Sequence, residues 1–192
     1  MTWRWPAAHG LAAVLLLGAP AGGPAPARFP DRPPLGHTGG FGEPTCTRCH
    51  AGDPVNSGGG TLTLEGLPES YQPGGRYRMA VTVTGPRIRR GGFQLAVRYA
   101  GDAPPGRPAG MLRRIDDRVH LAESLGVTYA FHTGVGSVLS APDRATWAVD
   151  WLAPADSPRT VVAHFTANAA NDDASELGDF IYADSVVSAP LR

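Results

Sequence analysis

The sequence contains no lysine, and its 17 basic side chains are balanced by 17 acidic ones. A chain with zero formal net charge has no basic excess with which to attract nucleic acid or an anionic membrane. Cysteine is almost as scarce, because both cysteines of the chain lie within one stretch of five residues. A secreted domain held together by disulfides would spread its cysteines over distant segments. We therefore expect a packed core to stabilise this protein.

Long apolar runs are also scarce, and residues 11–18 (LAAVLLLG) form the longest near the N-terminus. This run is too short for a transmembrane helix, which needs roughly 20 apolar residues. Arg4 precedes it, and Ala25-Pro26-Ala27 follows it in the form of a signal-peptidase site. The pattern predicts a signal peptide over residues 1–27, with an uncleaved anchor as the alternative. We expect a periplasmic or extracellular protein that has no transmembrane segment after cleavage.

Helical periodicity is weak throughout, and residues 116–125 are the best helix candidate. Apolar residues instead alternate with polar ones, and turn-forming glycine and proline separate the alternating runs. The clearest runs are residues 77–83, 93–99, 147–151 and 161–165. Several short strands without helical crossovers predict an all-β, Ig-like antiparallel β-sandwich over residues 61–192, with a closed barrel as the alternative.

The two cysteines belong to the motif Cys46-Thr47-Arg48-Cys49-His50, which has the C-x-x-C-H spacing of c-type heme attachment. Two thiols at this spacing can form thioethers with the two vinyl groups of one porphyrin. The adjacent imidazole of His50 can then bind the iron as its proximal ligand. A single motif predicts one covalent heme c, carried by an extended attachment segment over residues 28–60. Export supports this prediction, because bacterial heme c is attached outside the cytoplasm.

Other chemistries use similar cysteine pairs. A redox-active C-x-x-C normally begins a helix beside a βαβ unit, which this pattern lacks. A structural zinc site commonly needs a second cysteine pair, and the chain has none. A disulfide between Cys46 and Cys49, with His50 beside it by coincidence, stays open as an alternative.

The sixth ligand of the iron would have to come from elsewhere in the chain. His132 follows a strand-like run, 127–131, and precedes Thr133-Gly134, so we expect it at a strand end where a docked group can be reached. His37, in a glycine-flanked loop, is the second candidate, and an open iron is the third possibility. We expect Met79 to fill the core, and His164 and His120 to point into solvent. Met111 is a further candidate for the sixth ligand.

Several stretches resemble the choice-of-anchor V domain family. Residues 38–50 (TGGFGEPTCTRCH) and 56–60 (NSGGG) are similar to its opening, and residues 71–74, 92–95, 132–133, 147–154, 168–171 and 178–182 are similar to its body. The family is related to the Reeler domain, so the resemblance implies a Reeler-like β-sandwich in an exported bacterial protein. The resemblance also aligns the family's His-Thr pair with His132-Thr133, which favours His132 as an iron ligand.

These features together predict an exported monoheme c-type cytochrome that transfers electrons to or from another redox protein or a cytochrome complex. The alternatives are a heme-based binder or sensor with an open site, and a non-heme adhesion or scaffold module with a Cys46–Cys49 disulfide. No G-x-S-x-G motif or other catalytic pattern is present, so we expect no enzyme. One acidic loop has side chains suited to calcium but lacks EF-hand spacing, so calcium is an alternative there that we favour less than a solvated loop: Asp172, Asp173, Glu176 and Asp179.

Overall fold

The computed structural model describes residues 1–2, 31–156 and 158–191. The signal peptide predicted for residues 1–27 lies outside the described residues, apart from its first two. Within the described part of the chain, no helix is long and apolar enough to cross a membrane. Ten strands and one short 3-10 helix follow in order: η1 (Cys46–Arg48), β1 (Thr61–Glu65), β2 (Ser70–Tyr71), β3 (Arg76–Thr84), β4 (Arg90–Tyr99), β5 (Met111–Arg114), β6 (Val119–Ser124), β7 (Val127–His132), β8 (Arg144–Leu152), β9 (Val161–Ala170) and β10 (Phe180–Pro190).

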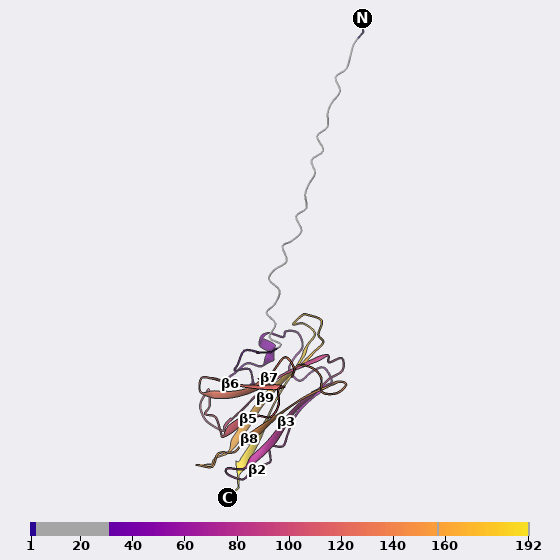
Figure 1. Cartoon of the computed structure of the whole chain (residues 1–192). Coiled ribbons are helices and arrows are strands. Elements are labelled where there is room, and N and C mark those ends of the chain that lie inside the picture. The colour runs from indigo at the N-terminus through magenta and orange to yellow at the C-terminus, as the bar shows by residue number, and fades with distance from the viewer. Residues whose placement is uncertain (3–30, 157, 192) are drawn as a thin grey trace.

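The strands form two sheets that face each other, as Figure 1 shows. The four-stranded sheet has the order β1-β3-β8-β5, and the six-stranded sheet has the order β2-β10-β9-β4-β7-β6. The strand pairs are antiparallel except for the two-residue pairing of β10 with β2. Both sheets are open, so the predicted antiparallel β-sandwich is confirmed over the closed barrel.

The core lies between the sheets and is formed by the alternating residues that the sequence singled out. The four-stranded sheet contributes Met79, Val81, Val83, Trp147, Val149 and Trp151, and the six-stranded sheet contributes Phe93, Leu95, Val97, Val161, Ala163 and Phe165. Phe93 stacks on Trp147 with ring centroids 4.6 Å apart. Met79 is fully buried here, as expected of a core residue. Period-two alternation therefore identified the inward face of each of these strands correctly.

Two local predictions are wrong. The best helix candidate, residues 116–125, contains strand β6, which pairs with β7 along its whole length. His164 does not point into open solvent, because the ring of Phe41 packs edge-on against its imidazole at 5.5 Å and its Nδ1 is buried. The β6–β7 pairing is local, because the two strands flank the turn at Leu125 and Gly126, whereas the cover over His164 comes from Phe41, which is distant in sequence.

The outer face of the six-stranded sheet is covered as well. Residues 31–60, which we call the attachment segment, contact this face through Leu35, His37, Glu43, Cys46 and His50. A second small apolar cluster forms beneath it from Ala96, Val127, Tyr129 and Phe131, with Leu35 packed on top. Strand β4 consequently has buried side chains on both faces, although its sequence alternates like that of a half-buried strand.

Candidate functional site

The C-x-x-C-H motif folds into a single tight turn. Thr45 caps η1, with its hydroxyl accepting a hydrogen bond from the peptide N–H of Thr47. The peptide N–H groups of Cys49 and His50 both donate to the carbonyl of Cys46, at 3.2 and 3.0 Å. Both cysteines and His50 then line one cavity against the six-stranded sheet. The turn thus brings the three side chains of the motif to a common site.

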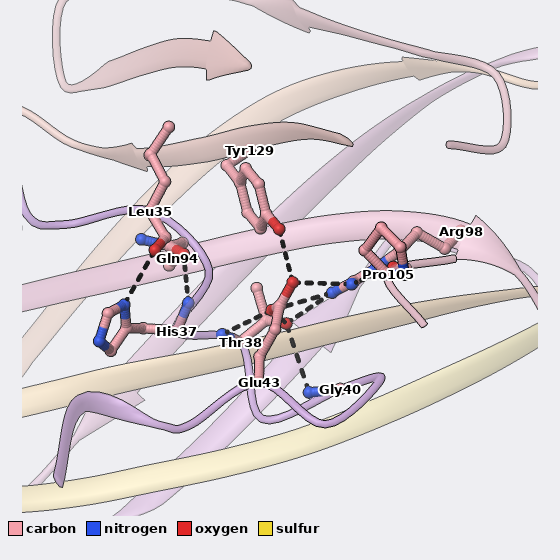
Figure 2. A network of polar contacts seen from close by, with 9 residues as sticks. All are labelled: Leu35, His37, Thr38, Gly40, Glu43, Gln94, Arg98, Pro105 and Tyr129. Atoms are coloured by element: carbon pink, nitrogen blue, oxygen red, sulfur yellow. Dashed lines mark hydrogen bonds and ion pairs between the residues drawn. The ribbon is translucent and has the colours of Figure 1, made fainter. Parts of the chain in front are cut away.

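A buried ion pair fixes the attachment segment just before this turn (Figure 2). Arg98 of β4 is fully buried, and its guanidinium contacts the carboxylate of Glu43 at 2.8 and 3.1 Å. Arg98 also donates to Thr38 Oγ1 at 2.8 Å, and its guanidinium lies over the ring of Phe41. The hydroxyl of Tyr129 donates to the same Glu43 carboxylate at 2.5 Å. The partners in this network come from the sheet, from the segment that it anchors and from the carbonyl of Pro105, which accepts a hydrogen bond from Arg98 at 2.8 Å.

The electrostatics of the network follow from burial and hydrogen bonding. Burial, the largest influence, would raise the pKa of Glu43, but hydrogen bonds from Arg98, Thr38 and Tyr129 outweigh it and the pKa lies below its ordinary value. Burial raises the pKa of Tyr129, and its hydrogen bond to the Glu43 carboxylate raises it further. Glu43 is thus held as an anion and Tyr129 as a neutral donor.

Cys46 and His37 meet at Thr166 of β9. The Thr166 hydroxyl donates to the carbonyl of His37 at 2.9 Å and lies 3.1 Å from the sulfur of Cys46. The peptide N–H of His37 donates to Gln94 Oε1, and its ring Nδ1 lies 3.1 Å from the carbonyl of Leu35. Burial raises the pKa of the Cys46 thiol, whereas Cys49 is exposed. The backbone of His37 is therefore fixed, and its imidazole borders the same cavity as the cysteines.

His50 is held by a carboxylate. Its Nδ1 lies 2.7 Å from Oδ2 of Asp179, which is only 4 % exposed. Asn168 donates to the same oxygen at 3.1 Å, and the peptide N–H of Asn171 donates to Asp179 Oδ1 at 3.1 Å. Burial alone would raise the pKa of Asp179, but the hydrogen bonds from His50, Asn168 and Asn171 lower it below its ordinary value.

Asn168 lies directly against the imidazole of His50. Its side-chain nitrogen is 3.1 Å from Nδ1 and 3.3 Å from Nε2 of that ring. Its Oδ1 is buried and has no hydrogen-bond partner among the described residues. Asn168 lines the cavity, and its side-chain nitrogen is the atom that contacts His50.

His132 is the last residue of β7, as predicted for a strand end. The backbone pairing of β4 with β7 ends at Gln94 and Phe131. Beyond this pair, the ring of His132 contacts the backbone of Phe93. Its Nδ1 accepts a hydrogen bond from the peptide N–H of Phe93 at 3.1 Å and lies 3.3 Å from the carbonyl of the same residue. The ring passes over Gly92, where a Cβ atom would lie only 2.9 Å from it. Only glycine leaves this space for the imidazole.

The cavity unites the predicted site residues. It has a volume of about 680 Å³, within the range of about 300–1,000 Å³ common for cofactor pockets. Its lining includes all five predicted residues, His37, Cys46, Cys49, His50 and His132, together with Gly92, Gln94, Asn168 and Asp179. Two thiols on the edge and imidazoles on different walls form a donor set that fits a covalently attached heme. The sequence did not assign Asn168 or Asp179 to this site. A buried asparagine has no sequence motif that predicts its contacts, and Asp179 was considered only as part of the acidic loop.

The other candidate ligands lie elsewhere. Met79 is in the core, and Met111 is exposed on β5 of the opposite sheet. His120 lies on β6 beside the ring of Phe131 and 3.9 Å from Asp31, and it does not line the cavity. His164 lies beneath Phe41, and burial lowers its pKa.

The side chains of the acidic loop are engaged in contacts of other kinds in the part of the chain that is described. There, no group of three or more His, Cys, Asp and Glu side chains is arranged to hold a metal ion. Asp172 pairs with Arg90 at 2.9 Å, and Asp173 accepts hydrogen bonds from Asn171 and Ser175 within the loop. Asp179 faces inward to His50. Asp179, the most buried acid of the loop, thus contacts His50 of the C-x-x-C-H turn.

Comparison with known proteins bears on the fold. No family model matches the sequence, and no curated protein matches it either. Among solved structures, the chain is similar to the reeler domain of human F-spondin, with 21% identity and a TM-score of 0.46 over 72% of this chain and 92% of that one. It is also similar to a cohesin module from Clostridium perfringens, with 12% identity and a TM-score of 0.45 over 68% and 94% of the two chains. The sandwich architecture rests on the sheet topology of this chain, and membership of the choice-of-anchor V family stays a prediction.

Proposed function

We propose that this chain is an exported monoheme c-type cytochrome that exchanges electrons with a second redox protein. The observation that carries the proposal is the cavity, in which the C-x-x-C-H turn and both candidate distal histidines meet. These residues are up to 95 positions apart (132 − 37 = 95), and nothing in the sandwich core requires them to converge. In this reading, Cys46 and Cys49 carry the heme and His50 binds its iron. A bound heme would supply a one-electron redox centre.

The strand register supports His132 as the second axial ligand. On the outer face of the sheet, Asn168 of β9 pairs directly with Gly92 of β4. His50 lies against Asn168, and His132 lies against Gly92, so the two imidazoles rest over directly opposed positions of neighbouring strands. Such positions have Cα atoms about 4.5–5.5 Å apart. His37 lies over the next outward-facing pair of these two strands, Gln94 and Thr166, and is the second candidate.

Two histidine ligands favour electron transfer over ligand binding. When imidazoles hold both axial positions, the iron is low-spin and closed to small molecules, and its potential is low relative to a heme with a methionine ligand. The cavity lies at the surface, where exposed Cys49 borders it, so one heme edge would be within reach of a partner protein. We therefore expect its partner to be a redox protein or a cytochrome complex outside the cytoplasm.

The test begins with covalent attachment. The full chain is expressed with its leader in a host able to mature c-type cytochromes, and heme is stained after denaturing electrophoresis. We expect the wild type to stain, and a variant with Cys46→Ala and Cys49→Ala to lose the stain. An unstained wild type would contradict the proposal and favour the scaffold alternative with its Cys46–Cys49 disulfide.

The absorption spectrum then tests the ligands. We expect low-spin bands in the wild type, conversion to high-spin bands in His132→Ala, and no change in His120→Ala, a matched control outside the cavity. If His132→Ala stays low-spin and His37→Ala becomes high-spin, His37 is the ligand. A wild type that is high-spin and binds carbon monoxide rapidly would instead favour the binder or sensor alternative.

A further inference from the structure

The three imidazoles around the cavity differ in what their Nδ1 atoms meet. Nδ1 of His37 lies 3.1 Å from the carbonyl of Leu35, whereas Nδ1 of His132 accepts a hydrogen bond from the peptide N–H of Phe93 at 3.1 Å and lies 3.3 Å from the carbonyl of the same residue. Nδ1 of His50 instead meets the carboxylate of Asp179 at 2.7 Å. A carbonyl is a neutral acceptor, whereas a carboxylate is charged and forms the stronger hydrogen bond. The histidine of the C-x-x-C-H turn is thus held by a carboxylate through its Nδ1.

We propose that Asp179 is a positioning residue that keeps His50 protonated on Nδ1, turns its Nε2 toward the iron and lowers the redox potential of the heme. The inference rests on the proposed function and adds to it a residue outside the attachment motif. A carboxylate behind a metal-bound imidazole fixes the tautomer and raises the basicity of the ligand. A more basic ligand donates more electron density, and this favours the oxidised iron.

The hydrogen bonds around Asp179 favour its charged form and hold its carboxylate in one position. Asp179 is 4 % exposed and accepts three hydrogen bonds, from His50, from the side chain of Asn168 and from the peptide of Asn171. Among the described residues its partners are His50, Asn168 and the peptide of Asn171, and no arginine is paired with it. A buried anion close to the iron stabilises the additional positive charge of the oxidised state, because the interaction is screened little in a site of low dielectric.

Asn168 contacts both members of the His50–Asp179 pair. Its amide donates to Asp179 Oδ2 and lies against both ring nitrogens of His50, so the plane of the imidazole is fixed from below. The proton on Nδ1 would stay between His50 and Asp179 while a bound heme exchanged one electron with the redox partner. The pair therefore sets the potential without transferring a proton.

The experiment compares Asp179→Asn with Asp172→Asn in the mature, heme-loaded protein. Asp172 is a matched control because it lines the same cavity, yet it is half exposed and paired with Arg90. We expect the midpoint potential of Asp179→Asn to rise by an amount equal to at least a tenfold change in the equilibrium between oxidised and reduced protein, which is about 59 mV for one electron. Asp172→Asn should change it far less, since solvent screens an exposed charge.

A second measurement needs no substitution at Asp179. In the reduced, diamagnetic wild type with ¹⁵N-labelled histidine, NMR should detect a slowly exchanging Nδ1 proton of His50. Equal potentials in wild type and Asp179→Asn, or a His50 that lacks the Nδ1 proton, would overturn the inference and leave the proposed function intact. A wild type without covalent heme would instead overturn the proposed function, and the inference with it.

Discussion

At the scale of single residues, Arg98 is the side chain on which the position of the attachment segment depends most. It is fully buried, and among the described residues its ion-pair partner is Glu43, from the segment itself. The sequence could not reveal this, because Arg98 occupies an outward position of an alternating strand, where a solvated arginine is the ordinary expectation. Its partner lies 55 residues away. The same coverage explains why His164 is not exposed to open solvent.

We predict that Arg98→Met lowers the free energy of unfolding by about 3–5 kcal/mol, because removal of one partner leaves the Glu43 carboxylate buried without its counter-ion. Chemical denaturation of the purified protein measures this. Arg113→Met, at an exposed position of β5, is the control and should change the free energy by less than about 0.5 kcal/mol. A small effect of Arg98→Met would mean that the ion pair does not hold the segment.

Glu43 should also make stability depend on acid. Its pKa in the folded protein is below the ordinary value of 4.5, so the folded state binds this proton less readily than the unfolded state. The stabilisation is therefore complete above about pH 4.5 and is lost as the pH falls through the lowered pKa. We predict that the stability difference between wild type and Glu43→Gln shrinks as the pH is lowered below 4.5. Denaturation curves over this range test it, and a pH-independent difference would contradict it.

At the scale of elements, the strands could be predicted from the sequence, whereas the contacts that cover their outer faces could not. Alternation identified the cores of β3, β4, β8 and β9 because burial on one face leaves a period of two. It could not show that the outer face of β4 is buried too, since this depends on a segment that has no periodicity. The C-x-x-C-H spacing predicted the cysteines and His50 of the site, whereas Asp179 was identified only as part of an acidic loop.

The end of β7 and the start of β4 form the other half of the site, and Gly92 lets them meet. We predict that Gly92→Ala shifts part of the protein from the low-spin to the high-spin spectrum, because the added methyl would lie 2.9 Å from the His132 ring and displace it. Gly134→Ala is the matched control, since its added methyl has only ordinary contacts, at 3.7 Å or more from Asp31. Identical spectra of Gly92→Ala and wild type would contradict His132 as the ligand.

At the scale of the whole molecule, the six-stranded sheet has two roles. Its inner face forms the sandwich core, and its outer face supports the attachment segment, with the cavity at the end of the sheet where β4 begins and β7 and β9 end. Figure 1 shows η1 at this end and the C-terminus at the opposite end. On the proposed function, the sandwich would serve as the scaffold, and the segment over residues 31–60 would supply the side chains that carry the heme.

The central claim is that Cys46 and Cys49 carry one heme covalently, and the mass of the intact protein tests it most directly. The protein is matured in a heme-competent host, denatured in acid to release any group held without a covalent bond, and weighed by mass spectrometry. Our account predicts the mass of the processed chain plus one heme, and that of the chain alone for the variant with Cys46→Ala and Cys49→Ala. A wild type with the mass of the bare chain, or of the chain less two hydrogens from a disulfide, would contradict it.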